Sequence, residues 1–376
     1  MKHIVYINNY ITEDIIKIRN NERFFSQPAN NKILNLIRAL ECAGIRTTVI
    51  SSALSSNGKK WYSAITGNKI SDSVIIYSGV LGFPLINSFS SVLSIYKIIK
   101  QIHKKDQIDR IIFYNFKPEA AWPAYLANKY LGIPISVEFE DGYMQIEELS
   151  SLKRYIFSYT EQIISKKVDK AIVANAHMMK QFSVPSFVLR GVVNPSFYTR
   201  CKTYNKLPNN TFTIFYSGGL DKSRGIHVLL EAMKYVHVPC KLQITGKGTI
   251  EHVDDRIEHL GFLDYDQMLQ NMIQADLLVQ CQLVNDKFAS VSFPSKLFEY
   301  IATGNYVISS LLPDVKDFAG DFFIYYKNDD PKELAEKIEY AYRLWKTGGK
   351  NNYDVIDLCE NNLPESIGKN LASFLD

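Results

Sequence analysis

The chain lacks any long uninterrupted apolar run, because charged residues break each apolar stretch before the roughly 18–20 residues that a membrane-spanning helix needs. Its five cysteines are scattered and odd in number, without the close pairs of zinc sites or disulfide frameworks, so free thiols in a reducing compartment are expected. The opening MKHIVYINNY is too weakly apolar for a signal peptide and predicts a strand. These absences predict a cytoplasmic protein.

Several chemical signatures are also missing. After the first predicted strand the chain reads INNYITED in place of the G-x-G-x-x-G fingerprint, which argues against a nicotinamide-dependent dehydrogenase. The histidines have no metal-ligand spacing and no close carboxylate cluster is present to hold a divalent ion, so no metal and no cofactor are expected. No nucleic-acid-binding module is recognisable, and nucleic acid is not expected as a partner.

The composition is typical of a globular protein, with 46% apolar and 22% charged residues. The length of 376 residues is enough for two domains. The charge is divided unevenly, since residues 1–200 carry 25 basic and 15 acidic residues and residues 201–376 carry 18 and 24. The basic half suits an anionic lipid surface, a phosphorylated acceptor or nucleic acid, and an ordinary solvated basic face is equally compatible with it.

Short apolar strands alternate with helical patterns along both halves, which is typical of parallel sheets built from βαβ units. The first half has predicted strands at 3–7, 46–51, 110–115, 135–139 and 171–175, with helices over 31–44 and 119–132. The alternation lapses in the polar stretch 201–210 and restarts at 213–218. We therefore predict an N-terminal domain over 1–200, a second domain over 201–345, and a helical segment over 346–376 that crosses back to the first domain.

The stretch FYSGGLDKSRGIHVLLEAM (215–233) takes a buried strand into a glycine pair, a charged loop and an amphipathic helix. Glycines let backbone amides approach a phosphate, and the start of the helix adds the positive end of its dipole. Lys222 and Arg224 stand beside the loop, and an arginine binds diphosphate oxygens through two parallel hydrogen bonds. The segment predicts a phosphate site, although a strand-to-helix turn with solvated cations has the same pattern.

A second stretch, FPSKLFEYIATGNYVISS (293–310), places Ser295 at the start of a helix whose free amides suit another phosphate. Glu299 follows one turn later, where a carboxylate can accept both hydroxyls of a ribose. A surface salt bridge is the alternative for Glu299.

Together these two segments resemble family 4 of the retaining glycosyltransferases (glycosyl transferases group 1), whose architecture is called GT-B. The resemblance spans nearly the whole chain and is most specific in the C-terminal half. The matching features there are the pattern at 218–225, the turn Gly246-Lys247-Gly248, the HLGF turn at 259–262, Ala275-Asp276, and Lys296-Leu297-Phe298-Glu299-Tyr300 with Gly304. It implies an α/β fold of two Rossmann-like parallel-sheet domains that face a central cleft, with an acceptor-binding N-terminal domain over 1–200 and a nucleotide-sugar-binding domain over 201–345.

The resemblance also implies roles for single residues. Arg224 would neutralise the departing diphosphate, Glu299 would hold the ribose, and amides near Ser295, Lys296 and Leu297 would surround the phosphates. Gly218, Gly219 and Lys222 would complete the phosphate loop, while Gly246 and Leu260 would border the sugar and the base. Fixed cations and amides stabilise the charge that develops on a leaving diphosphate, so no metal would be required.

The sequence departs from the family in two places. The arginine that the family usually carries in the phosphate loop is replaced by Gly219, with Lys222 as a substitute, and the first glutamate of the family's paired motif is replaced by Val291. In the first half Glu140 and Asp141 stand where the family has a His-Asp pair near the acceptor, so we predict a catalytic role for them, with a helix N-terminal acid as the alternative.

Two more features concern the acceptor. Asn9 and Tyr10 follow the first strand and are predicted to touch it. The stretch 90–105 places Val92, Ile95 and other apolar residues on one broad side and Lys97, Lys100, Lys104 and Lys105 on the other. It suits an anionic membrane surface, and an ordinary sheet-packing helix would look the same. The basic stretch 152–170 lies in the same half.

These features predict a metal-independent, hexosyltransferase-like enzyme that moves a sugar from a nucleotide-diphosphate donor to a glycan or lipid-linked glycan, with retention, in bacterial polysaccharide, lipopolysaccharide or capsule synthesis. We expect it in the cytoplasm, with peripheral contact to the inner face of the membrane as an option. Two alternatives stay open: a catalytically silent carbohydrate-binding or scaffold partner, and a sugar-nucleotide epimerase on the same fold.

Overall fold

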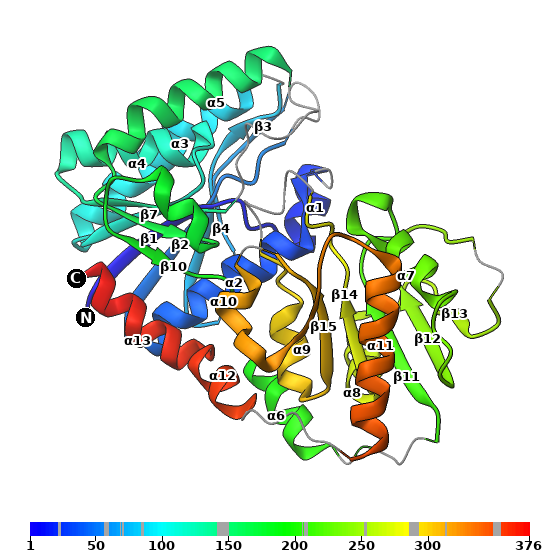
Figure 1. Ribbon diagram of the computed structural model, residues 1–376. Helices are drawn as coiled ribbons and strands as arrows, with labels where there is room; N and C mark the ends of the chain where they lie inside the picture. Colours follow the sequence, from blue (N-terminus) through cyan, green and yellow to red (C-terminus); the bar gives the residue numbers. More distant parts are fainter. Residues whose placement is uncertain are drawn as a thin grey trace. The chain divides into compact units, whose positions relative to one another are not determined.

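The computed structural model describes residues 1–376 except 22–23, 56–59, 68, 70, 84–85, 141–149, 205, 207–209, 252–253, 286–292, 313 and 349–354, and leaves out the side chains of 27, 28, 223, 355 and 356. The chain forms two compact units: unit 1 is Met1–Val192 with Pro364–Asp376, and unit 2 is Val193–Leu363. Each unit is an α/β domain around its own sheet (Figure 1).

Unit 1 contains an eight-stranded sheet that is parallel except for β4, which pairs antiparallel with β5. In spatial order its strands are β10 (Ser186–Val188), β9 (Lys170–Val173), β8 (Ile135–Phe139), β7 (Arg110–Tyr114), β1 (His3–Asn8), β2 (Arg46–Ser51), β5 (Val74–Tyr77) and β4 (Ile65–Thr66). The short strands β3 (Trp61–Tyr62) and β6 (Val80–Leu81) form a separate antiparallel pair. The central strands β1, β7 and β8 are buried throughout, as apolar runs in a parallel sheet require.

The helices of unit 1 cover both faces of its sheet (Figure 1). α4 (Pro118–Leu131) packs between α3 (Ile86–Lys105) and α5 (Ser151–Ile164), and α2 (Gln27–Cys42) packs against α13 (Pro364–Leu375). The remaining helical segments are α1 (Glu13–Arg19), η3 (Ser165–Lys167) and η4 (Ala176–Gln181). The C-terminal helix α13 approaches α2 closely, because a Cβ atom at Gly368 would lie 2.1 Å from the carbonyl oxygen of Ala39.

Unit 2 contains a six-stranded sheet whose pairs are all parallel. Its order is β13 (Ile257–His259), β12 (Cys240–Thr245), β11 (Phe212–Ser217), β14 (Leu277–Gln280), β15 (Tyr306–Ser310) and β16 (Ile324–Tyr326). On one face α7 (Ile226–Met233) packs with α11 (Pro331–Lys346), and on the other α6 (Pro195–Thr203), α8 (Tyr265–Gln274) and α12 (Val355–Asn361) pack with α9 (Leu297–Thr303). The short segments α10 (Val315–Ala319) and η6 (Gly320–Phe322) precede β16.

The two parallel sheets confirm the predicted α/β class. The units divide at 192/193 and 363/364, whereas the boundaries predicted from the sequence are 200/201 and 345/346. The first division comes earlier because α6 begins at Pro195, is capped by the Asn194 side chain, and packs against α9 within unit 2. Residues 201–203, predicted as linker, are therefore the last turn of a helix. None of the described helices is both long and apolar enough to cross a bilayer.

Candidate functional site

The loops that follow β11 and β12 lie together at the carboxyl edge of the unit 2 sheet, the edge where open α/β sheets bind ligands. The Gly218 amide donates to the Thr245 carbonyl at 3.0 Å, and the Leu220 amide donates to the Lys247 carbonyl at 3.0 Å. Only glycine fits at 246, because a Cβ atom there would stand 1.7 Å from the carbonyl oxygen of Gly218. The glycines thus let two loop backbones come into direct contact, which is a structural role that does not depend on a ligand.

Arg224 and Lys222 lie at this edge in η5, directly before α7, and both side chains are exposed. The turn is held by a hydrogen bond from the Arg224 amide to the Asp221 carbonyl at 3.1 Å. Beside Gly219 the space is already filled, since a Cβ atom there would lie 3.3 Å from Arg224 Cγ and 2.8 Å from Asp221 Oδ2. The stem of Arg224 therefore occupies the position next to the glycine that replaces the family's arginine.

Lys296 links the two motif segments. It stands at the N-cap of α9, and its Nζ atom donates to the Ser217 carbonyl oxygen, the last residue of β11, at 2.7 Å. Burial lowers the pKa of Lys296 to about 8, and the nearby positive charge of Arg224 acts in the same direction. The lysine is thus a partly enclosed cation held beside the phosphate loop.

Ser295 and Leu297 flank this lysine in different environments. Ser295 is exposed, whereas the side chain of Leu297 is fully buried in the unit 2 core. The Leu297 amide donates to the Pro294 carbonyl at 3.0 Å, so this donor is already used within the turn. The side chain of Lys296 is consequently the better-supported anion contact of the three.

Glu299 lies in the first turn of α9, half-buried, with one carboxylate oxygen enclosed. Burial raises the pKa of Glu299 to about 7, and the neighbouring Lys296 opposes that rise only in part. Within the part of unit 2 that the structure describes, its Oε2 atom has no hydrogen-bond partner. An enclosed acceptor without a donor costs free energy, and a ligand hydroxyl would remove that cost.

The turn at 259–262 joins the same edge from the far side. Gly246 donates its amide to the Gly261 carbonyl at 3.1 Å, and Leu260 donates its amide to the Ile244 carbonyl at 2.9 Å. The Leu260 side chain packs against the core beneath α8 and α9. Gly246 and Leu260 therefore shape the loop through their backbones.

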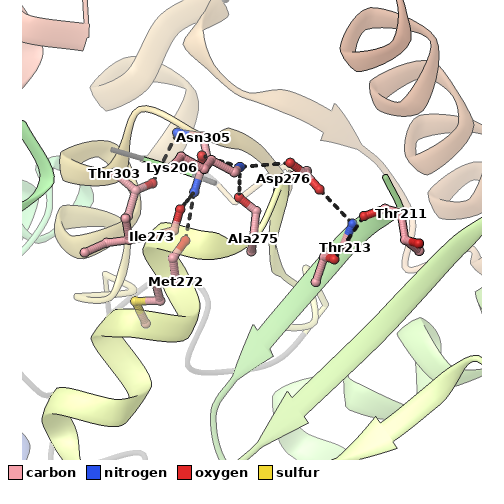
Figure 2. A network of polar contacts seen from close by, with 9 residues as sticks. All are labelled: Lys206, Thr211, Thr213, Met272, Ile273, Ala275, Asp276, Thr303 and Asn305. Carbon is pink, nitrogen blue, oxygen red and sulfur yellow. Dashed lines mark hydrogen bonds and ion pairs between the residues drawn. The ribbon is translucent and has the colours of Figure 1, made fainter. Parts of the chain in front are cut away.

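One part of the family pattern lies at the opposite, amino edge of the sheet (Figure 2). Asp276, directly before β14, is buried; its carboxylate accepts from the Thr213 amide at 2.9 Å and pairs with Lys206 Nζ at 2.8 Å. Lys206 also donates to the Ala275 carbonyl and reaches Asn305 Oδ1 at 3.4 Å. Asn305 in turn donates to the Met272 carbonyl at 2.8 Å. This network ties strand starts to the ends of α8 and α9, so Asp276 is structural.

In unit 1, Glu140 follows β8 and is buried in a polar network. Its Oε1 atom pairs with Lys32 Nζ of α2 at 2.6 Å, and its Oε2 atom accepts from the Tyr114 hydroxyl at 2.8 Å. Its amide donates to Asn115 Oδ1 at 2.9 Å. Glu140 is thus held by groups from α2, from the end of β7 and from the residue that follows β7. Asp141, predicted to act with it, lies outside the described residues, as does Val291.

Glu138 is two residues earlier on the same face of β8 and is also buried. Its Oε2 atom accepts a hydrogen bond from the Tyr6 hydroxyl, and its Oε1 atom has no hydrogen-bond partner among the described residues. Burial, together with the charge of Glu140, raises the pKa of Glu138 to about 8. The raised pKa favours the protonated form of Glu138, and Lys32 pairs with the neighbouring Glu140.

A cavity of about 330 Å³ opens beside this network at the carboxyl ends of β1, β2 and β7. Asn9 lines it, together with Ile11, Phe24, Phe25, Ser26, Ala29, Ser52, Leu54, Tyr114, Lys117 and Glu119. Tyr10 does not line it; its amide donates to Asn8 Oδ1 at 2.9 Å and its carbonyl accepts from Ser51 Oγ at 2.6 Å. Tyr114 touches both the cavity and Glu140, so it is the side chain that connects the two.

The sequence analysis did not single out Tyr6, Lys32 or Tyr114. Each lies in an apolar strand or an amphipathic helix and is separated from Glu140 by 26 or more positions, so no spacing rule brings them together. Among the described residues, no three histidine, cysteine or acidic side chains are grouped so as to hold a metal ion.

Comparison with known proteins agrees with this architecture. Residues 211–343 match the sequence model of the family described as Glycosyl transferases group 1. A sequence search of proteins with curated descriptions finds no significant match.

The solved structures similar to this chain include a sucrose-phosphate synthase from Thermosynechococcus elongatus, with a TM-score of 0.67 and 14% identity, covering 100% of this chain and 98% of that one. A glycosyltransferase from Rickettsia africae has a TM-score of 0.64 and 16% identity, and the match covers 99% of this chain and 97% of that one. Anabaena HepE in complex with UDP has a TM-score of 0.62 and 12% identity, and the match covers 100% of this chain and 99% of that one. The chain thus has the GT-B glycosyltransferase fold along its length and resembles group 1 glycosyl transferases over residues 211–343.

Proposed function

We propose that this chain is a glycosyltransferase that binds a nucleotide-diphosphate sugar at the carboxyl edge of unit 2. The observation that carries the proposal is the convergence of Arg224, Lys296 and Glu299 on the glycine loop after β11. Lys296 Nζ is anchored 2.7 Å from the Ser217 carbonyl oxygen, and Glu299 Oε2 is enclosed without a hydrogen-bond partner among the residues that the structure describes. Two cations and an unsatisfied carboxylate match the two ends of a nucleoside diphosphate, its phosphates and its ribose hydroxyls.

In this proposal Arg224 and Lys296 stabilise the charge that develops on the diphosphate as the glycosidic bond to it breaks. Fixed cations need no reorganisation during the reaction, which is why they lower the barrier effectively. Lys222 is free to add a third charge from the exposed loop. These groups do what a divalent ion does in other transferases, so the proposed reaction is independent of metal, and retention of configuration is proposed by resemblance to the family.

The acceptor is proposed to bind in the unit 1 cavity, with Asn9 and Tyr114 as hydrogen-bonding groups and Phe24 as an apolar wall. A mixed polar and aromatic lining suits a sugar ring, which has hydroxyls at its edge and apolar faces. We propose a glycan or lipid-linked glycan of bacterial polysaccharide, lipopolysaccharide or capsule synthesis as the acceptor. The basic character of residues 1–200 supports work at the inner surface of an anionic membrane.

The deciding experiment is a thermal-shift screen of UDP-, GDP-, ADP- and CMP-sugars, because a ligand that binds only the folded state raises its melting temperature. UDP-glucose is the first compound to test, since Anabaena HepE was solved with it. We expect one nucleotide class to stabilise the wild type and to lose this effect in Arg224→Ala. Arg200→Ala, which removes an exposed arginine elsewhere in unit 2, is the matched control.

Product analysis then separates the alternatives. Release of free nucleoside diphosphate with transfer to an acceptor supports the proposal. Conversion of the donor sugar without transfer would identify an epimerase, and binding without any turnover would identify a silent carbohydrate-binding partner. Failure of every nucleotide sugar to bind would overturn the donor site.

A further inference from the structure

Helix α5 carries an apolar stripe on its outer side. Leu152, Tyr155, Ile156 and Tyr159, which we call the α5 stripe, are 57%, 68%, 37% and 47% exposed. Their spacing of three and four residues places all of them on one face of the helix. The two tyrosine rings stack with centroids 6.2 Å apart and an interplanar angle of 16°. Single exposed apolar side chains are common, but four of them grouped on one helix face mark an interaction surface.

An adjoining side of α5 is fixed to unit 1. Thr160 and Ile164 are buried there, and the Trp122 indole of α4 donates to Thr160 Oγ1 at 3.1 Å. Figure 1 shows α5 along the outside of the layer that it forms with α3 and α4. These contacts hold the inner side of α5 against unit 1, while the α5 stripe stays exposed on the outer side.

Helix α3 repeats the same plan. The apolar side predicted to meet a membrane is covered, since Val92, Ile95, Ile98 and Ile99 are buried within unit 1. Its exposed side instead carries Ile86, Phe89 and Leu93, which are 49%, 65% and 53% exposed. Along the same side the helix continues with the exposed lysines Lys97, Lys100 and Lys104.

The two helices point the same way, because both cross from one parallel strand to the next. α5 continues into η3, where Lys166 and Lys167 are exposed. The apolar halves of α3 and α5 therefore lie at one end of the layer, and Lys97, Lys100, Lys166 and Lys167 lie toward the other.

The positive charge of this surface indicates which partner it binds. α3 has four lysines and no acidic residue, and Glu161, the acidic residue of α5, is partly buried. A second copy joined symmetrically through this face would bring identical cationic surfaces together, which is unfavourable. An anionic lipid surface supplies both the apolar layer for the aromatic and aliphatic side chains and the phosphates for the lysines.

We propose that α5 and α3 form a membrane-docking surface, in which the α5 stripe inserts at the interface of an anionic bilayer while Lys97, Lys100, Lys166 and Lys167 contact lipid phosphates. This docking rests on the proposed function in one respect, since it would bring the enzyme to a lipid-linked acceptor. Binding to vesicles, however, requires neither donor nor acceptor. A failure of docking would therefore leave the transferase proposal standing, and a failure of catalysis would leave the docking proposal standing.

The test is flotation of the full chain with vesicles of phosphatidylcholine containing about 30% phosphatidylglycerol, against pure phosphatidylcholine. We expect binding to the anionic vesicles only, weakening between about 50 mM and 500 mM salt. Tyr155→Ser/Tyr159→Ser should reduce the bound fraction at least about tenfold, since it removes apolar insertion and leaves every charge in place. Lys97→Glu/Lys100→Glu/Lys166→Glu/Lys167→Glu should reduce it at least as much.

The matched control is Tyr265→Ser/Tyr340→Ser, which removes two tyrosines of unit 2 that are each 45% exposed. It should float like the wild type. Tyr155→Trp should show a blue-shifted emission on anionic vesicles, which adsorption by charge alone would not produce. Equal flotation of the Tyr155/Tyr159 variant and the wild type, or no flotation of the wild type, would overturn the proposal. A dimer in solution that only the Tyr155/Tyr159 variant dissociates would instead assign the surface to a second copy.

Discussion

The polar sites at the carboxyl edges of the two sheets are built in opposite ways. In unit 2 the candidate donor groups come from two short segments, with Gly218 and Arg224 in one strand–loop–helix unit and Lys296 and Glu299 at the start of one helix. In unit 1 the network around Glu140 draws on α2, β1, β7 and β8. The first arrangement leaves charges accessible for a ligand, whereas the second satisfies most of them internally.

That difference has an energetic meaning. In unit 2, Glu299 Oε2 has no hydrogen-bond partner among the described residues, and the Arg224 guanidinium is exposed. The free-energy cost of enclosing the Glu299 oxygen is offset only when a ligand donates a hydrogen bond to it. In unit 1 a lysine, a tyrosine and an asparagine already bond to Glu140, so the network stabilises the fold itself. Substitutions in unit 1 should therefore affect stability first, and those in unit 2 should affect ligand binding first.

The largest expected effect comes from Lys32→Met. It leaves the Glu140 carboxylate buried beside Glu138 without its cation, which should lower the free energy of unfolding by about 3 kcal/mol. Urea denaturation at neutral pH measures the change. The double variant Lys32→Met/Glu140→Gln removes the unpaired charge and should recover most of the loss. Equal destabilisation of the single and double variants would show that the ion pair is not what matters.

Next come Arg224→Ala and Glu299→Ala, which should each weaken donor binding or kcat/KM by about 10- to 150-fold, or roughly 1.5–3 kcal/mol, because each removes a charge-assisted contact. Titration of the stabilising nucleotide sugar measures this, and the melting temperature without ligand should change little. Arg200→Ala, whose side chain is 41% exposed, and Glu336→Ala, at an exposed position of unit 2, are the controls. Wild-type affinity in both site variants would mean that the donor binds elsewhere.

A smaller effect concerns the two buried glutamates. Burial on folding raises the pKa of Glu299 to about 7 and that of Glu138 to about 8, from an ordinary value of 4.5. The folded state therefore holds more protons than the unfolded state between these values, and stability falls as pH rises through that window. Glu299→Gln and Glu138→Gln should each gain stability relative to the wild type by about 1–2 kcal/mol on going from about pH 5 to about pH 9.

Saturating donor separates these two groups. If ribose hydroxyls bind Glu299, the ligand should satisfy its charged form and abolish the gain of Glu299→Gln, while the gain of Glu138→Gln persists. Urea midpoints across the pH range, with and without nucleotide sugar, report both. Parallel behaviour of the two variants would remove the distinction between a ligand site in unit 2 and a structural network in unit 1.

The smallest expected effect is that of excess EDTA, which should leave the transferase rate unchanged because Arg224 and Lys296 supply positive charge at the diphosphate. Initial rates with and without chelator measure this. Loss of activity that Mg²⁺ or Mn²⁺ restores would contradict the proposed role of these side chains.

Much of unit 2 could be predicted because its elements are marked by local chemistry. The glycines at 218 and 246 predict tight loops, and both loops lie where expected.

In unit 1 the short strands β3, β4 and β6 were not predicted, since two residues cannot show an alternating pattern. The domain boundary at 192/193 was also not predicted, because it depends on which unit α6 packs against.

The sequence by itself determined the α/β class and the donor-site candidates, because strand periodicity, glycine turns and cationic loops act over a few neighbouring residues. Only the tertiary structure decided which groups are satisfied: it pairs Lys32 with Glu140, leaves Glu299 Oε2 open, and assigns Asp276 to a structural network. It also decided that the predicted apolar side of α3 is core and that α5 exposes a stripe. Burial and partnership arise from residues far apart in the chain, so local sequence patterns could not reveal them.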